Sequence, residues 1–255
     1  MSRLDNRWPY IACQGNHDLG YSAAEYRYSM MPNYIYPERN SAFAKTLVST
    51  GTNYEGIHTM ENSAYEFHDE AWGDLLIISF EFAPRDEALD WARQLIESER
   101  FVNHKVIILT HSFLATNGDR IVEEGYKLTP RNWAQAVWEK LIYPSKNIKM
   151  VLCGHTGNPP KIRKGEDVDY HMTTSYRVDK AADGHEVVQM MFNSQNGDGS
   201  WNGNGGDCWL RILEFKPDGK TIGVRTFSPL FALSRHTQHL AWRTAGYDQF
   251  FITIE

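Results

Sequence analysis

The sequence predicts an α/β fold whose first part holds a largely parallel sheet and whose second part is mostly antiparallel. Two observations favour the parallel part: several strand-length runs are apolar throughout, as in strands covered on both faces, and predicted helices separate these runs. A third observation favours the antiparallel part, since apolar and polar residues alternate after residue 160 in short runs joined by turn-forming segments.

The first hundred residues predict two strands and two helices. The strands are residues 8–14 (WPYIACQ) and 73–82 (GDLLIISFEF), and the helices are residues 22–31 and 84–101. Ser22 is a suitable N-cap for the first helix, and Pro32 ends it. The second helix begins at Pro84, carries acids in its first turn and places its apolar residues on one face. Between the first helix and the second strand we expect a long polar connection.

The remaining elements follow the same logic. Residues 104–110 (HKVIILT) and 147–153 (NIKMVLC) are predicted buried strands, and a helix bracketed by prolines lies between them at residues 130–144. Four alternating strands are predicted later in the chain, at residues 169–179, 185–195, 208–215 and 221–229. KPDGK (216–220) predicts a hairpin turn. With no internal repeat and no linker, we expect a single domain over residues 1–255, mostly parallel over 1–160 and with a mostly antiparallel second sheet over 161–255.

Composition excludes some classes of function. The formal net charge is −6, and no cluster of Lys and Arg gives the footprint of a nucleic-acid-binding protein. No apolar stretch approaches the roughly 20 residues of a transmembrane helix. The N-terminal residues lack the apolar core of a signal peptide.

Polar side chains follow three of the apolar runs: YIACQ is followed by GNHD, VIIL by THS and MVLC by GHTG. Because ligands gather at the carboxyl ends of parallel strands, we expect Asn16, His17, Asp18, His111 and His155 to lie close together. Imidazole nitrogens and an amide oxygen suit Zn, Mn, Fe or Ni. Each motif alone is more often structural, so the prediction rests on their conjunction.

GNHD, VIILTHSF and VLCGHTG, in this order, resemble the motifs of the calcineurin-like metallophosphoesterases. Residues 62–92, QMMFNSQ, GGDCWLRILEFKPDGKTI and TFSP are similar to a bacterial branch of that family, so the resemblance covers nearly all of the chain. It implies a four-layer α/β/β/α sandwich of two mixed sheets. It also implies hydrolysis of phosphate esters at two divalent metal ions, which clamp the phosphate and activate a water molecule.

The resemblance also implies roles for individual residues. Asn16, His111 and His155 would be metal ligands, and His17 would protonate the leaving group as a general acid. Asp18 would hold the His17 ring. On the substrate side, Asn193 and Gln195 could face the metals from the second sheet.

The chain departs from the family pattern before Gly15, where the Asp-x-His and Gly-Asp-x-x-Asp motifs are absent, and at Gly157, where many members have a second His. His171 or His185 could replace that His, although a strand or a surface turn explains each as well. We therefore expect missing N-terminal strands, at most one metal ion and impaired activity in a truncated chain. An exposed sheet edge would favour self-association. An inactive ligand-binding module and a non-functional fragment stay open as alternatives, as do substrate, metal and localisation.

Overall fold

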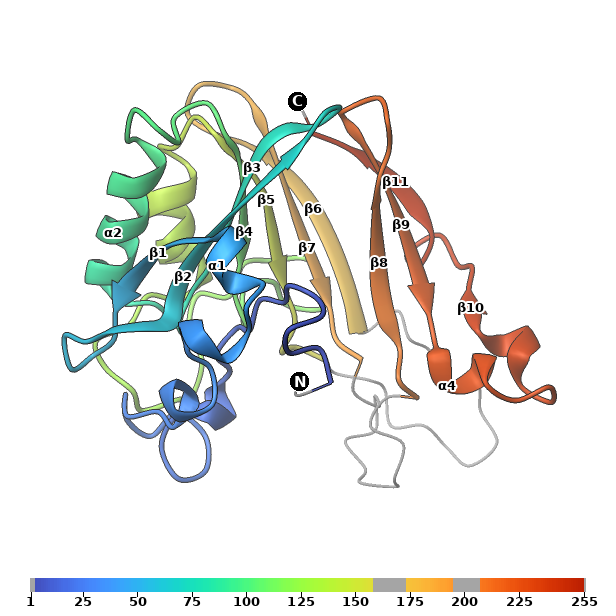
Figure 1. Cartoon of the computed structure of the whole chain (residues 1–255), viewed down its shortest axis with the longest axis horizontal. Coiled ribbons are helices and arrows are strands. Elements are labelled where there is room, and N and C mark those ends of the chain that lie inside the picture. The colour runs from blue at the N-terminus through green and yellow to red at the C-terminus, as the bar shows by residue number, and fades with distance from the viewer. Residues whose placement is uncertain (1–2, 158–172, 195–206, 255) are drawn as a thin grey trace.

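The computed structural model of the chain describes residues 3–157, 173–194 and 207–254 (Figure 1). The larger of its two sheets has seven strands in the order β1-β2-β3-β4-β5-β7-β6. These strands are β1 Leu47–Thr52, β2 His58–Asp69, β3 Gly73–Ser79, β4 Lys105–Leu109, β5 Ile148–Cys153, β6 Thr174–Lys180 and β7 Glu186–Phe192. The smaller sheet consists of β8 Leu210–Phe215, β9 Thr221–Phe227, β10 Trp242–Arg243 and β11 Phe250–Thr253.

Helices cover the face of the large sheet that points away from the small sheet (Figure 1). These are α2 Asp86–Ile96 and α3 Ala134–Val137, whereas α1 Phe43–Thr46 precedes β1 and α4 Pro229–Ala232 follows β9 beside the small sheet. A π-helical turn, η4 Trp138–Ile142, continues α3, and the short 3-10 turns are η1 Asn16–Asp18, η2 Met31–Asn33, η3 Pro37–Arg39 and η6 Gln238–Leu240. Within the described ranges no helix is long and apolar enough to cross a membrane.

The centre of the large sheet is parallel: β3 pairs with β4, β4 with β5, and β5 with β7 in the same direction. The outer strands β1, β2 and β6 run antiparallel to their neighbours. The predicted α/β fold with two sheets is thus confirmed. The division at residue 160 is not where the sheets separate, because β6 and β7 complete the large sheet and the small sheet starts only at β8.

Two apolar cores hold these layers together. Between the sheets, Ile107, Met150 and Val188 of the large sheet pack in one cluster with Ile222 and Ile252 of the small sheet. On the other face, apolar side chains of α2, α3 and η4 pack against β3, β4 and β5. The strands at the centre of the large sheet are therefore covered on both faces, as their unbroken apolar runs predicted.

Most of the predicted elements are confirmed with shorter bounds. The helix expected over 84–101 is α2, and the one expected over 130–144 is α3 with η4. The KPDGK turn joins β8 to β9, with Gly219 at a φ of +72° and the Asp218 carboxylate accepting hydrogen bonds from the Thr221 amide (2.8 Å) and hydroxyl (2.6 Å).

The strand expected over residues 8–14 is wrong. This segment pairs with no strand, because β2 and β4 already occupy both edges of β3. Side chains hold it instead: the Ser79 hydroxyl donates to the Ala12 carbonyl (3.1 Å), and the Gln14 amide donates to Glu61 (2.6 Å) and accepts from the Phe82 backbone (3.2 Å). The segment therefore reaches the end of β3 without joining the sheet.

The helix expected over residues 22–31 is also wrong. Ala24 has a φ of +52°, a left-handed conformation that no α-helix contains. The Arg27 side chain is only 2% exposed and points into the protein, where it donates hydrogen bonds to backbone carbonyls of other segments. The chain forms a loop whose shape this buried arginine determines.

The polar connection expected before β3 contains the β1–β2 hairpin. The sequence pattern concealed β2 because Glu61, Asn62 and Ser63 are buried in it, each at 3% exposure or less. Such residues are depleted from protein interiors unless they have hydrogen-bond partners. Here the Asn62 side chain accepts from the Glu81 amide (3.0 Å), which joins β2 to the end of β3.

Neighbouring residues of β11 test the packing between the sheets. Ile252 is 3% exposed and belongs to the inter-sheet core, whereas Phe251 points outward and is 72% exposed. We expect Ile252→Ala to lower the free energy of unfolding by about 2–4 kcal/mol, since it removes buried methyl groups and leaves a cavity. Phe251→Ala should change it by less than about 0.5 kcal/mol. Urea denaturation measures both, and equal losses would contradict this assignment of faces.

Candidate functional site

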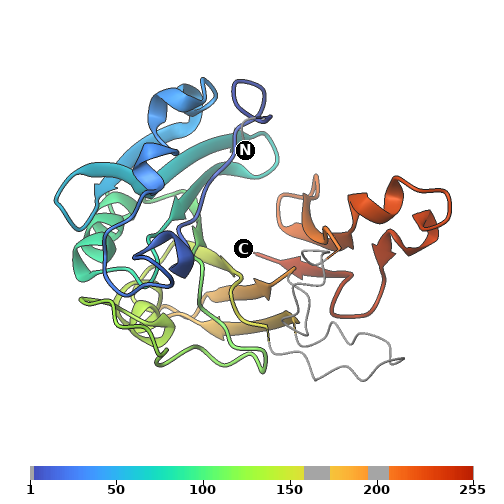
Figure 2. The ribbon, with the colours of Figure 1, turned by 90° about the horizontal axis from the view of Figure 1, so that it is seen from below.

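Three segments that are distant in sequence meet beyond the carboxyl ends of β4 and β5. They are η1, the turn that follows β4 at His111, and the turn that follows β5 at His155. The Gly154 amide donates to the His111 carbonyl (3.0 Å) and joins the last two turns. In the view of Figure 2 the N-terminal segment, in blue, lies at the same end of the molecule as these turns.

Asn16, His111 and His155 bring three donor atoms together as predicted, although the run before Asn16 is not a strand. His111 Nε2 lies 2.9 Å from Asn16 Oδ1 and 3.1 Å from His155 Nδ1. His111 Nε2 carries at most one proton, so it can donate a hydrogen bond to only one of these two atoms. The Asn16 oxygen and the His155 nitrogen therefore both direct lone pairs toward His111 Nε2. A cation in place of that proton would face all three atoms. An amide oxygen and two imidazole nitrogens therefore fit a first-row divalent metal.

Glu124 fixes the orientation of His155, and the sequence offered no signal for it. Its Oε1 lies 2.9 Å from His155 Nε2, and its Oε2 accepts a hydrogen bond from the Ser112 hydroxyl (2.9 Å). Because His155 Nε2 then carries the proton, Nδ1 is left with a lone pair toward His111. The Tyr126 hydroxyl accepts from the Asn16 amide nitrogen (3.1 Å), which turns the Asn16 oxygen toward the same region.

The backbone around these side chains is tightly packed. A Cβ atom on Gly15 would lie 3.0 Å from the His111 ring, so any larger residue would push the ring out of place. His155 has a φ of +66°, a left-handed conformation that is unfavourable for residues other than glycine. Such backbone outliers cluster at functional sites.

Burial keeps His111 neutral at pH 7. Burial first, and positive charge on His155 and His17 in addition, lower the pKa of His111 to about 4, while the Glu124 carboxylate opposes this shift. A neutral imidazole is the form that binds a metal ion.

His17 is exposed beside this cluster, and its partner differs from the expected one. Its Nδ1 donates to the Ser22 carbonyl (2.7 Å), which leaves Nε2 as the nitrogen that can exchange a proton. The Asp18 carboxylate instead accepts from the Gly15 amide (2.7 Å) and closes the η1 turn. Asp18 therefore stabilises the turn, and the expected contact with the His17 ring is replaced by the Ser22 carbonyl.

The other candidate residues have different positions. Asn193 follows β7 and its side-chain nitrogen donates to the His155 carbonyl (3.0 Å), so it supports the turn that carries His155. Gln195 and His171 lie outside the described residues. His185 bonds to Asp183 and to the carbonyl of Ile148, at the start of β5, so it is at the opposite end of the sheet and cannot act as a ligand here.

The donor set differs from that of most protein metal sites in its charge. Among the residues that the structure describes, no group of three or more His, Cys, Asp or Glu side chains could hold a metal ion. The cluster of Asn16, His111 and His155 consists of two imidazoles and one amide, all neutral. A dication would gain no attraction from a carboxylate ligand within this set, which weakens its binding.

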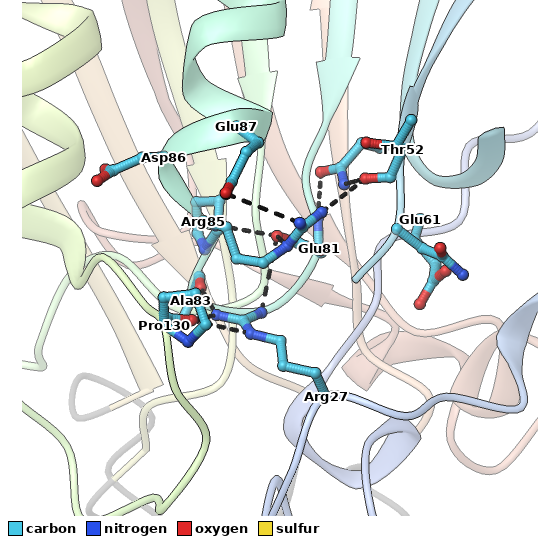
Figure 3. Close-up of polar contacts among 12 residues, drawn as sticks. Arg27, Thr52, Glu61, Glu81, Ala83, Arg85, Asp86, Glu87 and Pro130 are labelled. Atoms are coloured by element: carbon cyan, nitrogen blue, oxygen red, sulfur yellow. Dashed lines mark hydrogen bonds and ion pairs between the residues drawn. The ribbon is translucent and has the colours of Figure 1, made fainter. Parts of the chain in front are cut away.

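A buried network of ion pairs and hydrogen bonds joins Arg27 to the residues that follow β3 (Figure 3). Arg27 donates to the carbonyls of Phe82 (2.9 Å) and Ala83 (2.6 Å) and lies 3.7 Å from Glu81, which also pairs with Arg85 (2.9 Å). The network joins the loop after η1 to the residues that follow β3. The Phe82 ring contacts the rings of His111 and His155, with centroids 5.7 and 6.0 Å apart, so the network supports the floor of the site.

Comparison with known proteins agrees with the motifs at this site. The family description "Calcineurin-like phosphoesterase" matches residues 2–159, which include all three donor residues. The chain is also 25% identical over 235 residues to "Uncharacterized protein YvnB" of Bacillus subtilis (strain 168). That alignment covers 90% of this chain and 15% of YvnB, so the chain spans only a small part of this relative.

Metal binding tests the convergence of the three donors. We expect about one Mn²⁺ or Zn²⁺ ion per folded chain, and His111→Ala should weaken the affinity by more than about tenfold because it removes the central donor atom. His68→Ala is the control, since its side chain is 72% exposed and pairs with Asp74 at the far end of β2. Isothermal titration calorimetry measures both. Unchanged binding in His111→Ala would show that the metal binds elsewhere.

Removal of Arg27 tests the buried network. Arg27→Met leaves Glu81 with one fewer positive partner and several buried carbonyls without a donor, so the free energy of unfolding should fall by about 3–5 kcal/mol. Arg93→Met removes an ion pair with Asp90 whose side chains are 36% and 57% exposed, and the loss there should stay below about 1 kcal/mol. Urea denaturation measures the free energy of unfolding of both variants, and similar losses would contradict a larger stabilising effect of the buried Arg27.

Proposed function

The chain belongs to the calcineurin-like phosphoesterase family, and on this basis we propose that it hydrolyses phosphate esters with a divalent metal ion at the cluster of Asn16, His111 and His155. The observation that supports this most is the convergence of the three donor atoms, with the exposed His17 next to Asn16 in η1.

Asn16 Oδ1, His111 Nε2 and His155 Nδ1 would hold the ion, which can be Mn, Fe, Zn or Ni by the chemistry of these donors. The bound ion would neutralise charge on the phosphate and lower the pKa of a water molecule. These residues provide for one ion. Because the donor set is neutral, we propose that the ion is held weakly and that activity depends on added metal and is low without it.

His17 would act as the general acid. With Nδ1 donating to the Ser22 carbonyl, the protonated ring carries its second proton on Nε2, which can be delivered to the oxygen of the leaving group. Its exposure allows the ring to regain a proton from solvent after each turnover. Asp18 would serve this step indirectly, by holding the turn that carries His17.

Asn193 would act on the substrate side of the site. Its side-chain nitrogen donates to the His155 carbonyl, which places Asn193 next to the turn that carries a proposed metal ligand. We propose the same substrate-side role for Gln195. We do not propose the alternatives of an inactive binding module or a non-functional fragment, because the donor atoms of the site are assembled and supported.

Hydrolysis of two aryl phosphates tests the role of His17. We expect His17→Ala to lower kcat for phenyl phosphate by about 10²–10⁴-fold, the usual contribution of a general acid. The loss for p-nitrophenyl phosphate should be smaller, since p-nitrophenolate is a good leaving group that needs no proton. Metal binding should be unchanged, and His236→Ala serves as an exposed control. Equal losses on both substrates would contradict general-acid catalysis, and the absence of metal-dependent hydrolysis by the unchanged chain would overturn the proposed function.

A further inference from the structure

Tyr126 lies beside the cluster of Asn16, His111 and His155, in the loop between β4 and α3. Its hydroxyl oxygen lies 3.1 Å from Asn16 Nδ2, and its ring contacts the His155 ring with centroids 6.0 Å apart. Two of the three donor residues are thus direct neighbours of this one side chain. Any ligand that the cluster holds would bind close to the Tyr126 hydroxyl.

Aromatic packing fixes the Tyr126 ring. It meets Phe82 edge to face, with centroids 5.2 Å apart and an interplanar angle of 88°, and it lies 6.4 Å from the Trp133 ring. The same half-buried ring packs against the apolar cluster that contains Leu19 and Leu128. A polar group that is fixed in this way can stabilise a transition state without having to reorganise during the reaction.

The hydroxyl proton of Tyr126 has no acceptor among the residues that the structure describes. The oxygen accepts from Asn16 Nδ2, and a phenol that accepts one hydrogen bond still has its own O–H to donate. The carboxylate two residues earlier is already occupied, because Glu124 contacts His155 and Ser112. A phenol keeps its proton at neutral pH. One donor beside the cluster is therefore unused.

The Asn16 carboxamide relates this hydroxyl to the proposed ion. Its oxygen is the atom that faces His111 and would bind the ion, and its nitrogen is the atom that contacts Tyr126. The oxygen and the nitrogen of one carboxamide are nearly as far apart as two oxygens of one phosphate group. A phosphate alongside this amide can therefore bind the ion through one oxygen and accept from Tyr126 through another.

We propose that Tyr126 is a catalytic residue that donates a hydrogen bond from its hydroxyl to an oxygen of the reacting phosphate. The inference rests on the proposed hydrolysis of phosphate esters. In the transition state of phosphoryl transfer, negative charge is spread over the three equatorial oxygens, and catalysis depends on fixed groups that stabilise it. The proton stays on Tyr126 throughout, so this role is distinct from that of the general acid.

Tyr126→Phe tests this role, since it removes only the hydroxyl and keeps the ring that packs against Phe82. We expect kcat for phenyl phosphate at saturating Mn²⁺ to fall by about 10²–10³-fold, the usual loss when one transition-state donor is removed. Tyr143→Phe is the matched control and should leave kcat unchanged. That ring packs against Trp138, and the Tyr143 carbonyl accepts from Ala182 in the β6–β7 turn, at the opposite end of the large sheet.

A binding measurement separates donation to the phosphate from orientation of Asn16. Vanadate adopts the five-coordinate geometry of the transition state, so calorimetric titration of the Mn²⁺-loaded chain should show at least about tenfold weaker vanadate binding in Tyr126→Phe. Tyr143→Phe should bind vanadate as the unchanged chain does. A hydroxyl that only orients Asn16 would alter the affinity for Mn²⁺, but kcat and vanadate binding at saturating Mn²⁺ would be unaffected.

The outcomes distinguish this inference from the proposed function. If the unchanged chain hydrolyses phenyl phosphate and Tyr126→Phe has the same kcat or the same affinity for vanadate, the role of Tyr126 is overturned and the proposed function stands. If the unchanged chain shows no metal-dependent hydrolysis, the proposed function is overturned, and the role of Tyr126 with it.

Discussion

The parallel register of β4 and β5 is the constraint on which the candidate site depends. Leu109 pairs with Leu152, so the two strands end at nearly the same level. His111 lies two residues after Leu109, and His155 lies three residues after Leu152. Apolar packing on both faces of the sheet fixes this register, since a shift by one residue would turn buried side chains toward the wrong face. The hydrophobic cores therefore determine where β4 and β5 end, and this brings the donor atoms of His111 and His155 together.

The elements that the sequence predicted are those whose position follows from local pattern. In β3, β4, β5 and α2, a pattern only a few residues long predicts which side chains are buried. His111 and His155 could be predicted to meet because each follows an apolar run and parallel strands end at a common edge. Asn16 meets them although the run before it forms no strand, because hydrogen bonds of Ser79 and Gln14 hold that segment at the end of β3.

Other features could not be predicted because they depend on contacts between distant segments. The segment over residues 8–14 is as apolar as a strand, yet both edges of β3 are taken. Arg27 cannot be recognised from its neighbours in sequence, since its acceptors belong to Phe82, Ala83 and Pro130. Glu124 lies in a loop without a motif, and only the fold brings it to His155. Buried polar groups of this kind leave little trace in a hydrophobicity pattern.

The three donor residues are far apart along the chain: Asn16 and His111 are separated by 95 residues, and His111 and His155 by 44. An unfolded chain would have to close two long loops to bring them together, at a considerable cost in entropy. An ion that uses all three donors would therefore bind the native state in strong preference to the unfolded one. By mass action it would draw the folding equilibrium toward the native state, and its concentration would become one of the variables that set thermal stability.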